Sequence, residues 1–333
     1  MSRTVFVTGG AGYVGSHCCK AFADAGWNVV VYDNLSRGWP EFAQWGPLIE
    51  GDINDLDALT RSMQATRPDA VAHFAALAYV GESVEDPALY YKTNVIGTLN
   101  ILTAMRAAGV RDLVFSSTCA TYGPPVYMPI DERHPQAPIN PYGSTKLIAE
   151  WMMRDHSAAY DFRYVALRYF NAAGADPSGT IGERHEPETH VIPLALRGAG
   201  RDDYVFNILG TDYDTPDGTA VRDYIHVADL ASAHLKALDY LRDGGESTMI
   251  NLGTGHGTSV KEIHAAVEAV TGCKVEAKPS PRRPGDPSRL VADPAKALQL
   301  LGWKAERSDV TTIIQDAWTW HLAETERAAL KAR

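Results

Sequence analysis

Thr4-Val-Phe-Val-Thr8 runs directly into Gly9-Gly-Ala-Gly12-Tyr-Val-Gly15, and this join between two patterns sets the fold class that we expect. The first part is typical of a short buried strand. The three glycines would let the backbone turn tightly, approach a pyrophosphate and pack a following helix on the sheet. A glycine repeat alone is a weak signal, so the interpretation depends on the rest of the chain.

The second predicted strand supports that interpretation. Trp27-Asn-Val-Val-Val-Tyr32 ends at Asp33, where a carboxylate can bond both hydroxyls of an adenosine ribose. A 2′-phosphate would meet an acidic group there, so the sequence favours NAD. Arg37 lies nearby and keeps NADP open as the lesser alternative.

Strand-like and helical patterns alternate through the first half of the chain. We expect strands at 4–8, 28–32, 48–50, 70–73, 113–115 and 164–168. This alternation predicts an α/β fold with a Rossmann-type doubly wound parallel sheet. After residue 175 the pattern loosens, with Pro and Gly clusters at 177–182 and 213–218, which predicts a smaller α/β substrate lobe at the carboxyl end.

Tyr142 and Lys146 are four residues apart in a helical pattern, so they share one helix face. Free tyrosine titrates at about pH 10, so a tyrosine base needs positive charge nearby. One charge about 5 Å away, at an effective dielectric of roughly 20, is worth about 3 kcal/mol. Lys146 would supply that charge. Thr118 follows a predicted strand, where its hydroxyl can bond a substrate hydroxyl.

Composition narrows the possible partners and location. The net charge of −10 argues against a nucleic-acid or membrane-surface partner. No apolar run approaches the roughly 20 residues that span a bilayer, and no room for a signal peptide precedes Thr4, so we expect a cytoplasmic protein. Four cysteines lack metal-ligand spacing, which predicts reduced thiols and no metal site. Of these, Cys119 adjoins Thr118.

Ordered phrases run from Val5 to about Trp320. They are TGGAGYVGSH at 8–17, DNLS at 33–36, EGDI at 50–53, HFAAL at 73–77, VGES at 80–83, NVIGT at 94–98, LRYFNAAGA at 167–175, DGTAVRDYIHVADL at 217–230 and RRPGD at 282–286. With these phrases the chain resembles the extended short-chain dehydrogenases/reductases (the NAD-dependent epimerase/dehydratase family), and more closely the UDP-glucose 4-epimerases. The resemblance implies that bound NAD serves the interconversion of UDP-glucose and UDP-galactose through a 4-keto sugar.

The resemblance also implies two sets of site residues, with Tyr142, Lys146 and Thr118 as the catalytic group. The cofactor set is Gly9, Gly12, Tyr13, Val14, Gly15, Asp33, Asn34, Leu35, Ser36, Arg37, Gly38, Asp52, Ile53, Phe74, Ala75, Ala76, Leu77, Ala78, Asn94, Thr118, Tyr142, Lys146 and Phe170. The substrate set is Thr118, Tyr142, Asn171, His190, Asn207, Leu209, Arg222, Arg283, Asp286 and Leu290. Ala78 stands where relatives often have a Lys, so one cofactor contact would be missing.

Within the substrate set, the resemblance places Asn171, Arg222 and Arg283 at the diphosphate and Asp286 at the uridine ribose. Guanidinium groups suit phosphate because they bond it in bidentate fashion. Asn207 and Leu209 would lie near uracil. His190 would make a polar substrate contact where relatives frequently have Asn, and Leu290 would line the pocket near the carbon 2 substituent.

Three alternatives to this function remain. Related dehydratases and decarboxylases carry an acidic residue after the Thr, whereas this chain has Cys119-Ala120-Thr121, which favours epimerisation. Leu290 is intermediate in size, so UDP-N-acetylhexosamine substrates stay open. UDP-xylose/UDP-arabinose substrates stay open because the sequence gives no clean test for the carbon 6 hydroxymethyl. A non-enzymatic, NAD-dependent regulatory protein is the alternative of another class, although both Tyr142 and Lys146 are present.

The resemblance finally implies a division of the chain and an assembly. Residues 1–175 would form the NAD-binding domain, with 223–251 returning to it, and residues 176–222 and 252–333 would form the UDP-sugar lobe. The helices around 90–107 and 145–159 would form an intersubunit four-helix bundle in a homodimer.

Overall fold

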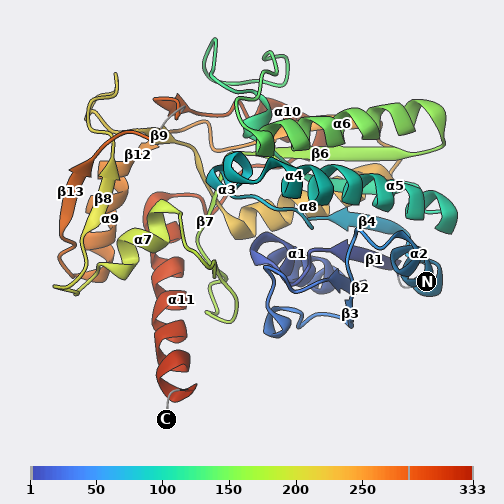
Figure 1. Cartoon of the computed structure of the whole chain (residues 1–333), viewed down its shortest axis with the longest axis horizontal. Coiled ribbons are helices and arrows are strands. Elements are labelled where there is room, and N and C mark those ends of the chain that lie inside the picture. Colours follow the sequence, from blue (N-terminus) through green and yellow to red (C-terminus); the bar gives the residue numbers. More distant parts are fainter. Residues whose placement is uncertain (1–2, 284–285, 332–333) are drawn as a thin grey trace.

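The computed structural model describes residues 3–283 and 286–331 (Figure 1). Its centre is a seven-stranded sheet in the order β11-β6-β5-β4-β1-β2-β3, and each neighbouring pair is parallel. The strands are β1 (Arg3–Thr8), β2 (Trp27–Asp33), β3 (Leu48–Glu50), β4 (Ala70–His73), β5 (Asp112–Thr118), β6 (Arg163–Tyr169) and β11 (Thr248–Leu252). The predicted Rossmann-type sheet is confirmed, and the direction in which the chain adds strands to it reverses between β1 and β4.

Helices cover both faces of the sheet. One face carries α1 (Tyr13–Asp24), α8 (Val227–Arg242) and α10 (Ala295–Leu301), and the other carries α2 (Leu56–Thr66), α5 (Gly97–Ala108) and α6 (Pro141–Ala159). Side chains of β1 alternate between the two cores: Val5 and Val7 join the first cluster of buried residues, whereas Phe6 joins the second. Burial on both faces explains why these strands read as apolar runs.

Two strands differ from the sequence prediction. β5 continues past Phe115 to Thr118, so the polar run Ser116–Thr118 is part of the strand. β11 was not predicted as a strand, yet it pairs with β6 at the edge of the sheet, and α8 packs against α1. α10 packs in the same core as α8 although it lies beyond residue 251. The division of the chain into two domains stays a prediction.

The second lobe lies beside the carboxyl ends of β5 and β6 (Figure 1). It contains the strand pairs β7 (Asn171–Ala173) with β10 (Tyr224–His226) and β8 (Phe206–Leu209) with β13 (Ala277–Ser280), the three strands β12 (Thr258–Ser259), β9 (Val221–Arg222) and β14 (Arg289–Leu290), and the helices α7 (Val191–Arg197), α9 (Val260–Thr271) and α11 (Val310–Lys331). Its core lies between the strands and these helices. Two short helices, α3 (Val80–Glu85) and α4 (Pro87–Tyr90), and a π-helical turn (Tyr91–Ile96) lead into α5.

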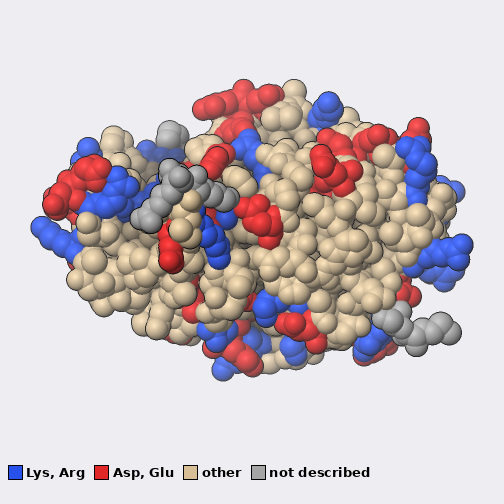
Figure 2. Space-filling model, turned by 90° about the horizontal axis from the view of Figure 1, so that it is seen from below, with Lys and Arg blue, Asp and Glu red and all other residues tan. Residues whose placement is uncertain are grey.

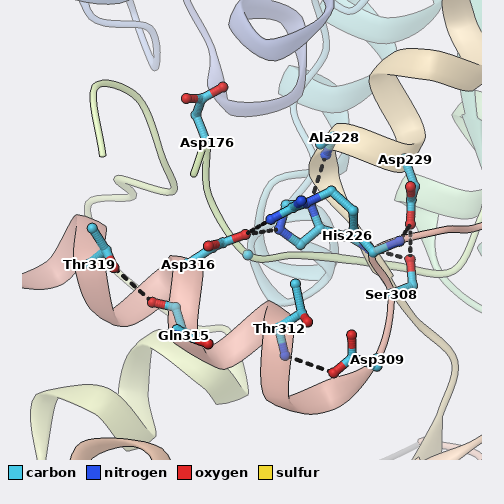
Figure 3. Close-up of polar contacts among 12 residues, drawn as sticks. Asp176, His226, Ala228, Asp229, Ser308, Asp309, Thr312, Gln315, Asp316 and Thr319 are labelled. Carbon is cyan, nitrogen blue, oxygen red and sulfur yellow. Dashed lines mark hydrogen bonds and ion pairs between the residues drawn. The ribbon is translucent and has the colours of Figure 1, made fainter. Parts of the chain in front are cut away.

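A buried polar network joins the lobes at the start of α8. Figure 3 shows His226 close to Asp316 on α11 and to Ser308. The Ala228 amide donates to His226 Nδ1 at 3.0 Å, so Nε2 carries the proton and donates to Asp316 at 3.1 Å. Ser308 donates to the Asp229 carboxylate at 2.6 Å. These bonds fix α11 relative to the sheet.

A buried ion pair ties α6 to the sheet. Arg168 on β6 and Glu150 on α6 have side chains 1% and 3% exposed, with Nη2 and Oε2 2.5 Å apart. Arg168 Nε also donates to Glu150 Oε1 at 2.9 Å, and the Ser117 hydroxyl of β5 donates to the same oxygen at 2.5 Å. The Glu150 carboxylate therefore bonds to both β5 and β6, the strands that form the base of the site.

The chain carries no helix, in its described part, that is long and apolar enough to cross a membrane. On the face shown in Figure 2, basic and acidic side chains are interspersed.

We expect Arg168→Met to destabilise the fold by about 3 to 5 kcal/mol, because it leaves the Glu150 charge buried without its partner. The measurement is the free energy of unfolding in urea. Arg163→Met is a matched control on the same strand: Arg163 bonds Asp112 through Nε and Nη2, both at 2.9 Å, but its side chain is 36% exposed. That screened pair should cost at most about 1 kcal/mol. Equal losses in the two variants would contradict the role given to the buried pair.

Candidate active site

A cavity of about 520 Å³ opens at the carboxyl ends of the parallel strands, where doubly wound sheets bind their ligands. Its wall is formed by the segments after β1, β2, β4, β5 and β6, by the start of α6, and by the second lobe. The cavity therefore touches both sets of residues that the sequence singled out.

The glycine loop forms a tight turn whose backbone leaves no room for larger side chains. Gly9 has a φ of +75°, and a Cβ on it would lie 2.4 Å from the Ala75 amide nitrogen. A Cβ on Gly15 would lie 2.1 Å from the Gly9 carbonyl oxygen. α1 begins at Tyr13, directly after this turn, so its first amides face the cavity. This backbone arrangement fits a pyrophosphate.

Asp33 lies at the end of β2 with its carboxylate in the cavity wall. The amides of Ala11 and Leu35 donate to its two oxygens at 3.0 and 2.9 Å. Burial raises the pKa of Asp33, and these two amide bonds oppose the rise. The fixed carboxylate fits the hydroxyls of a ribose and disfavours a 2′-phosphate.

Arg37 is committed to other groups on the rim. Its Nη2 lies 2.5 Å from Glu82 Oε1, its Nη1 donates to the Glu186 carbonyl at 3.2 Å, and its guanidinium lies 5.0 Å from the centre of the Tyr79 ring. These contacts join three segments across the cavity. The residue that kept NADP open thus already has acidic and carbonyl partners.

Tyr142 and Lys146 are positioned by the start of α6. Asn140 caps the helix by accepting a bond from the Gly143 amide at 2.8 Å, and Pro141 takes the first helical position. Thr118 is the last residue of β5, and its hydroxyl accepts a hydrogen bond from the Ala120 amide at 3.1 Å. Lys146 is buried and donates to the Ser116 carbonyl at 2.7 Å. All three predicted catalytic side chains line the cavity.

The electrostatics of this group differ from the expectation. Burial raises the pKa of Tyr142 well above the free value, and the nearby Thr118 side chain only partly opposes the rise. Burial also lowers the pKa of Lys146 to about 7, against the opposing charge of Glu150. Lys146 alone therefore does not turn Tyr142 into a phenolate in the protein, because desolvation is the larger effect.

The second lobe contributes polar groups of both signs to the wall. Arg222 is buried, forms an ion pair with Asp286 and donates to the carbonyls of Val221 and Pro287, both at 2.8 Å. Arg283 also lines the cavity and is exposed. Asn171, Leu290 and Phe170 complete this side of the wall.

Five predicted residues do not line the cavity. They are Leu35, Asp52, Asn94, Asn207 and Leu209; the other predicted cofactor and substrate residues do. Asn94 is buried behind the wall, where its side chain accepts from the Leu77 amide at 2.8 Å and donates to the Leu77 carbonyl at 3.0 Å. Asn207 is exposed on β8 and accepts a bond from Ser280 at 3.1 Å.

The wall also contains residues that sequence reasoning missed. Tyr169 at the end of β6 shares a 2.6 Å bond with Ser116, and Tyr79 follows β4. Glu183 and His185 lie in a loop that also holds Glu188 and His190. Two His and three Glu within the eight residues 183–190 are a pattern from which a polar cluster could have been predicted.

That cluster is compact. One ligand atom from each of Glu183, His185, Glu188 and His190 lies within 4.8 Å of the others, so the group could hold a metal ion. The same atoms also form hydrogen bonds: His185 Nδ1 bonds to Glu183 Oε1 at 3.1 Å, and His190 Nδ1 bonds to Glu188 Oε1 at 3.0 Å. The absence of a metal stays a prediction.

Cys119 lines the cavity beside Thr118 as a protonated thiol. Desolvation raises its pKa to about 12, although Arg222 opposes the rise. A thiol in this state is a poor nucleophile. Cys18 and Cys19 are buried in the core under α1.

A doubly wound sheet with a glycine loop, a ribose-side carboxylate and a Tyr–Lys–Thr group at its carboxyl edge defines a Rossmann-fold protein of the short-chain dehydrogenase/reductase class. Residues 5–253 match the model of the NAD dependent epimerase/dehydratase family, and the chain belongs to that family, as predicted.

Its relatives include proteins of one named activity. The UDP-glucose 4-epimerase of Rhizobium meliloti is 54% identical over 320 residues, which cover 96% of this chain and 97% of that protein. The crystal structure of UDP-glucose 4-epimerase from Brucella ovis in complex with NAD is 52% identical with a TM-score of 0.93, covering 95% of this chain and 98% of the other. The Bifidobacterium longum UDP-glucose 4-epimerase in complex with NAD⁺ and UDP is 38% identical with a TM-score of 0.92, covering 97% and 99%.

Proposed function

We propose that the chain is a UDP-glucose 4-epimerase, which interconverts UDP-glucose and UDP-galactose through a 4-keto sugar with tightly bound NAD. One observation carries the proposal: Tyr142, Lys146 and Thr118 line the same cavity as the glycine loop, Arg222 and Arg283. The names of the relatives support the same activity.

The cavity fits the cofactor. The pyrophosphate would lie over Gly9, Gly12 and Gly15, and the adenosine ribose would bond Asp33. When bound, NAD supplies a reversible hydride acceptor at carbon 4 of the sugar. The other cavity-lining residues from the loops after β2 and β4 would surround the bound NAD.

The chain's own residues manage the proton. Tyr142 would take the proton from the carbon 4 hydroxyl and return it, and Thr118 would orient that hydroxyl. In the protein alone burial favours the neutral phenol, so proton acceptance needs positive charge in the cavity. The charge of Glu150 favours the protonated form of Lys146, which helps to provide it.

The positions of the acidic groups in the wall favour epimerisation over elimination. Of the described residues that line the cavity, three are acidic. Asp286 is paired with Arg222, Glu183 lies against two histidines, and Asp33 accepts two backbone amides. No carboxyl among these residues follows Thr118 in the chain, where a dehydratase would place its acid.

Substrate selection is assigned to the second lobe. Arg222 and Arg283 would bind the diphosphate, and Leu290 would limit the carbon 2 substituent. Its intermediate size supports unsubstituted hexoses and leaves N-acetylhexosamines as one alternative. UDP-pentoses, which lack the carbon 6 hydroxymethyl, are the other.

The four free cysteines support a cytoplasmic location, where thiols stay reduced.

Purified protein should interconvert UDP-glucose and UDP-galactose without added nucleotide, because the cofactor returns to its starting state. NMR assays with each UDP-sugar, including UDP-xylose and UDP-N-acetylglucosamine, would measure the specificity. Accumulation of one equivalent of free NADH per product would contradict the epimerase. Binding without any turnover would favour the regulatory alternative.

We expect Tyr142→Phe to lower kcat by about a hundredfold to ten-thousandfold, because the ring stays in place while the proton acceptor is lost. UDP-glucose affinity and NAD content should persist. Tyr169→Phe is the matched control, since it also removes a phenol from the wall but one that bonds Ser116. Near-normal turnover by a folded, NAD-loaded Tyr142→Phe protein would overturn the mechanism.

We also propose that the chain forms a homodimer through α5 and α6. Large apolar side chains are exposed on these helices, with Leu99 at 42% and Trp151 at 47%, and Ile96 in the turn before α5 is 51% exposed. Sedimentation equilibrium should therefore give twice the mass of the 36.2 kDa chain, and Leu99→Glu should shift it toward the monomer. The exposed Leu298→Glu on α10 is the control. A wild-type mass of one chain would rule out the dimer.

A further inference from the structure

His190 is held between two carboxylates at the wall of the cavity. It precedes α7, and its Nδ1 lies 2.8 Å from Glu183 Oε1 and 3.0 Å from Glu188 Oε1. Its side chain is nevertheless 44% exposed and lines the cavity. The two ring nitrogens point in different directions, so Nε2 is left for a ligand.

Both carboxylates are fixed in place. The amides of Thr189 and His190 donate to Glu188 Oε1 at 2.7 and 2.8 Å, and the Glu188 side chain is 2% exposed. Glu183 is 7% exposed and accepts a second bond from His185 Nδ1. The His185 ring in turn lies edge-on to Tyr13 and Tyr79. Glu183 and Glu188 therefore stay beside His190 when a ligand binds.

The protonation state of His190 decides what Nε2 can do. In a neutral ring whose Nδ1–H faces the carboxylates, Nε2 can only accept a hydrogen bond. In the imidazolium form, Nε2–H is a donor. Glu183 and Glu188 favour the charged form, and the pKa of His190 rises to about 10 although burial opposes the rise. The same contacts lower the pKa of Glu183 to about 2.

Besides the two carboxylates, His185 is a titratable group close to this ring, with its ring centre 5.0 Å away and its Nδ1 on Glu183. Burial raises the pKa of Tyr13 well above its free value and that of Tyr79 to about 12. The Arg37 guanidinium lies over the Tyr79 ring and pairs with Glu82. Because two carboxylates surround one imidazolium, the cluster gives no net positive charge. It gives one directed N–H group.

We propose that Glu183 and Glu188 are positioning residues that keep His190 as a hydrogen-bond donor at Nε2, directed at an oxygen of the bound UDP-sugar. This rests on the proposed function. The two carboxylates make an imidazole behave like an amide, whose donor does not depend on pH. The guanidinium groups of the wall attract the phosphates, and His190 orients the UDP-sugar by one directed hydrogen bond.

The test compares UDP-glucose binding by calorimetry from about pH 6 to pH 8.5, with NAD-loaded protein in the Tyr142→Phe background to prevent turnover. UDP-glucose is the probe because its phosphates do not titrate in this range. The parent protein should bind with nearly constant affinity. Glu183→Gln/Glu188→Gln should bind about tenfold to a hundredfold more weakly at pH 8.5 than at pH 6, since His190 then loses its proton near its ordinary pKa of about 6.5.

Rescue and control variants separate this role from a structural one. Adding His190→Asn to the double variant supplies an amide donor and should remove the pH dependence. Glu186→Gln makes the same charge change in an exposed residue of the same loop and should behave like the parent. A flat profile in the double variant, or a sloping one after His190→Asn, would overturn the proposal.

Three further measurements do not depend on turnover. In protein labelled with ¹⁵N-histidine, both His190 nitrogens should carry protons at about pH 8, and only one should do so in the double variant. A neutral His190 in the parent would overturn the proposal even if the enzyme is active. One equivalent of tightly bound metal, lost in the double variant, would overturn it by showing a metal site. Loss of NAD with unchanged UDP-glucose binding would assign the donor to the cofactor instead.

Discussion

The buried ion pair between Glu150 and Arg168 governs the position of the active-site helix. Burying two charges is tolerated because each is fully bonded: Ser117 also donates to Glu150, and Arg168 also donates to the Tyr122 hydroxyl at 2.9 Å. Lys146 lies one helical turn before Glu150. The carboxylate that anchors α6 to the sheet therefore also favours the charged form of the lysine on the same helix, so the support of the fold and the chemistry of the cavity share one electrostatic system.

The fold was predictable where local sequence reports burial. Strands covered on both faces read as apolar runs, and the backbone of the glycine loop leaves no room for larger residues. β11 was missed because its place at the edge depends on pairing with β6, about eighty residues earlier. The last three residues of β5 were not predicted as strand because Ser116, Ser117 and Thr118 resemble turn residues. In the structure they are buried: Ser116 bonds to Tyr169, Ser117 donates to Glu150, and Thr118 accepts a bond from the Ala120 amide.

The residues that belong to the site were largely predictable, but the bonds that these residues make with one another were not. A motif can assign Arg222 and Asp286 to the cavity, yet only packing shows that they pair with each other. Likewise, Arg37 was read as a group facing the ribose, whereas it pairs with Glu82. The raised pKa of Tyr142 follows from desolvation, and helical spacing contains no information about the amount of water that a fold excludes.

The late return of the chain to the sheet has a consequence for synthesis. The core beneath α1 contains Val5 and Val7 together with Ile250, Leu252 and Trp303. Translation adds residues one at a time from the amino terminus, at roughly 5 to 20 per second. The first strands therefore leave the ribosome many seconds before the residues that cover one of their faces. During that interval the apolar surface under α1 and the unpaired edge of β6 are open to chaperones or to other nascent chains, and co-translational folding of the sheet cannot finish until the second lobe has largely been made.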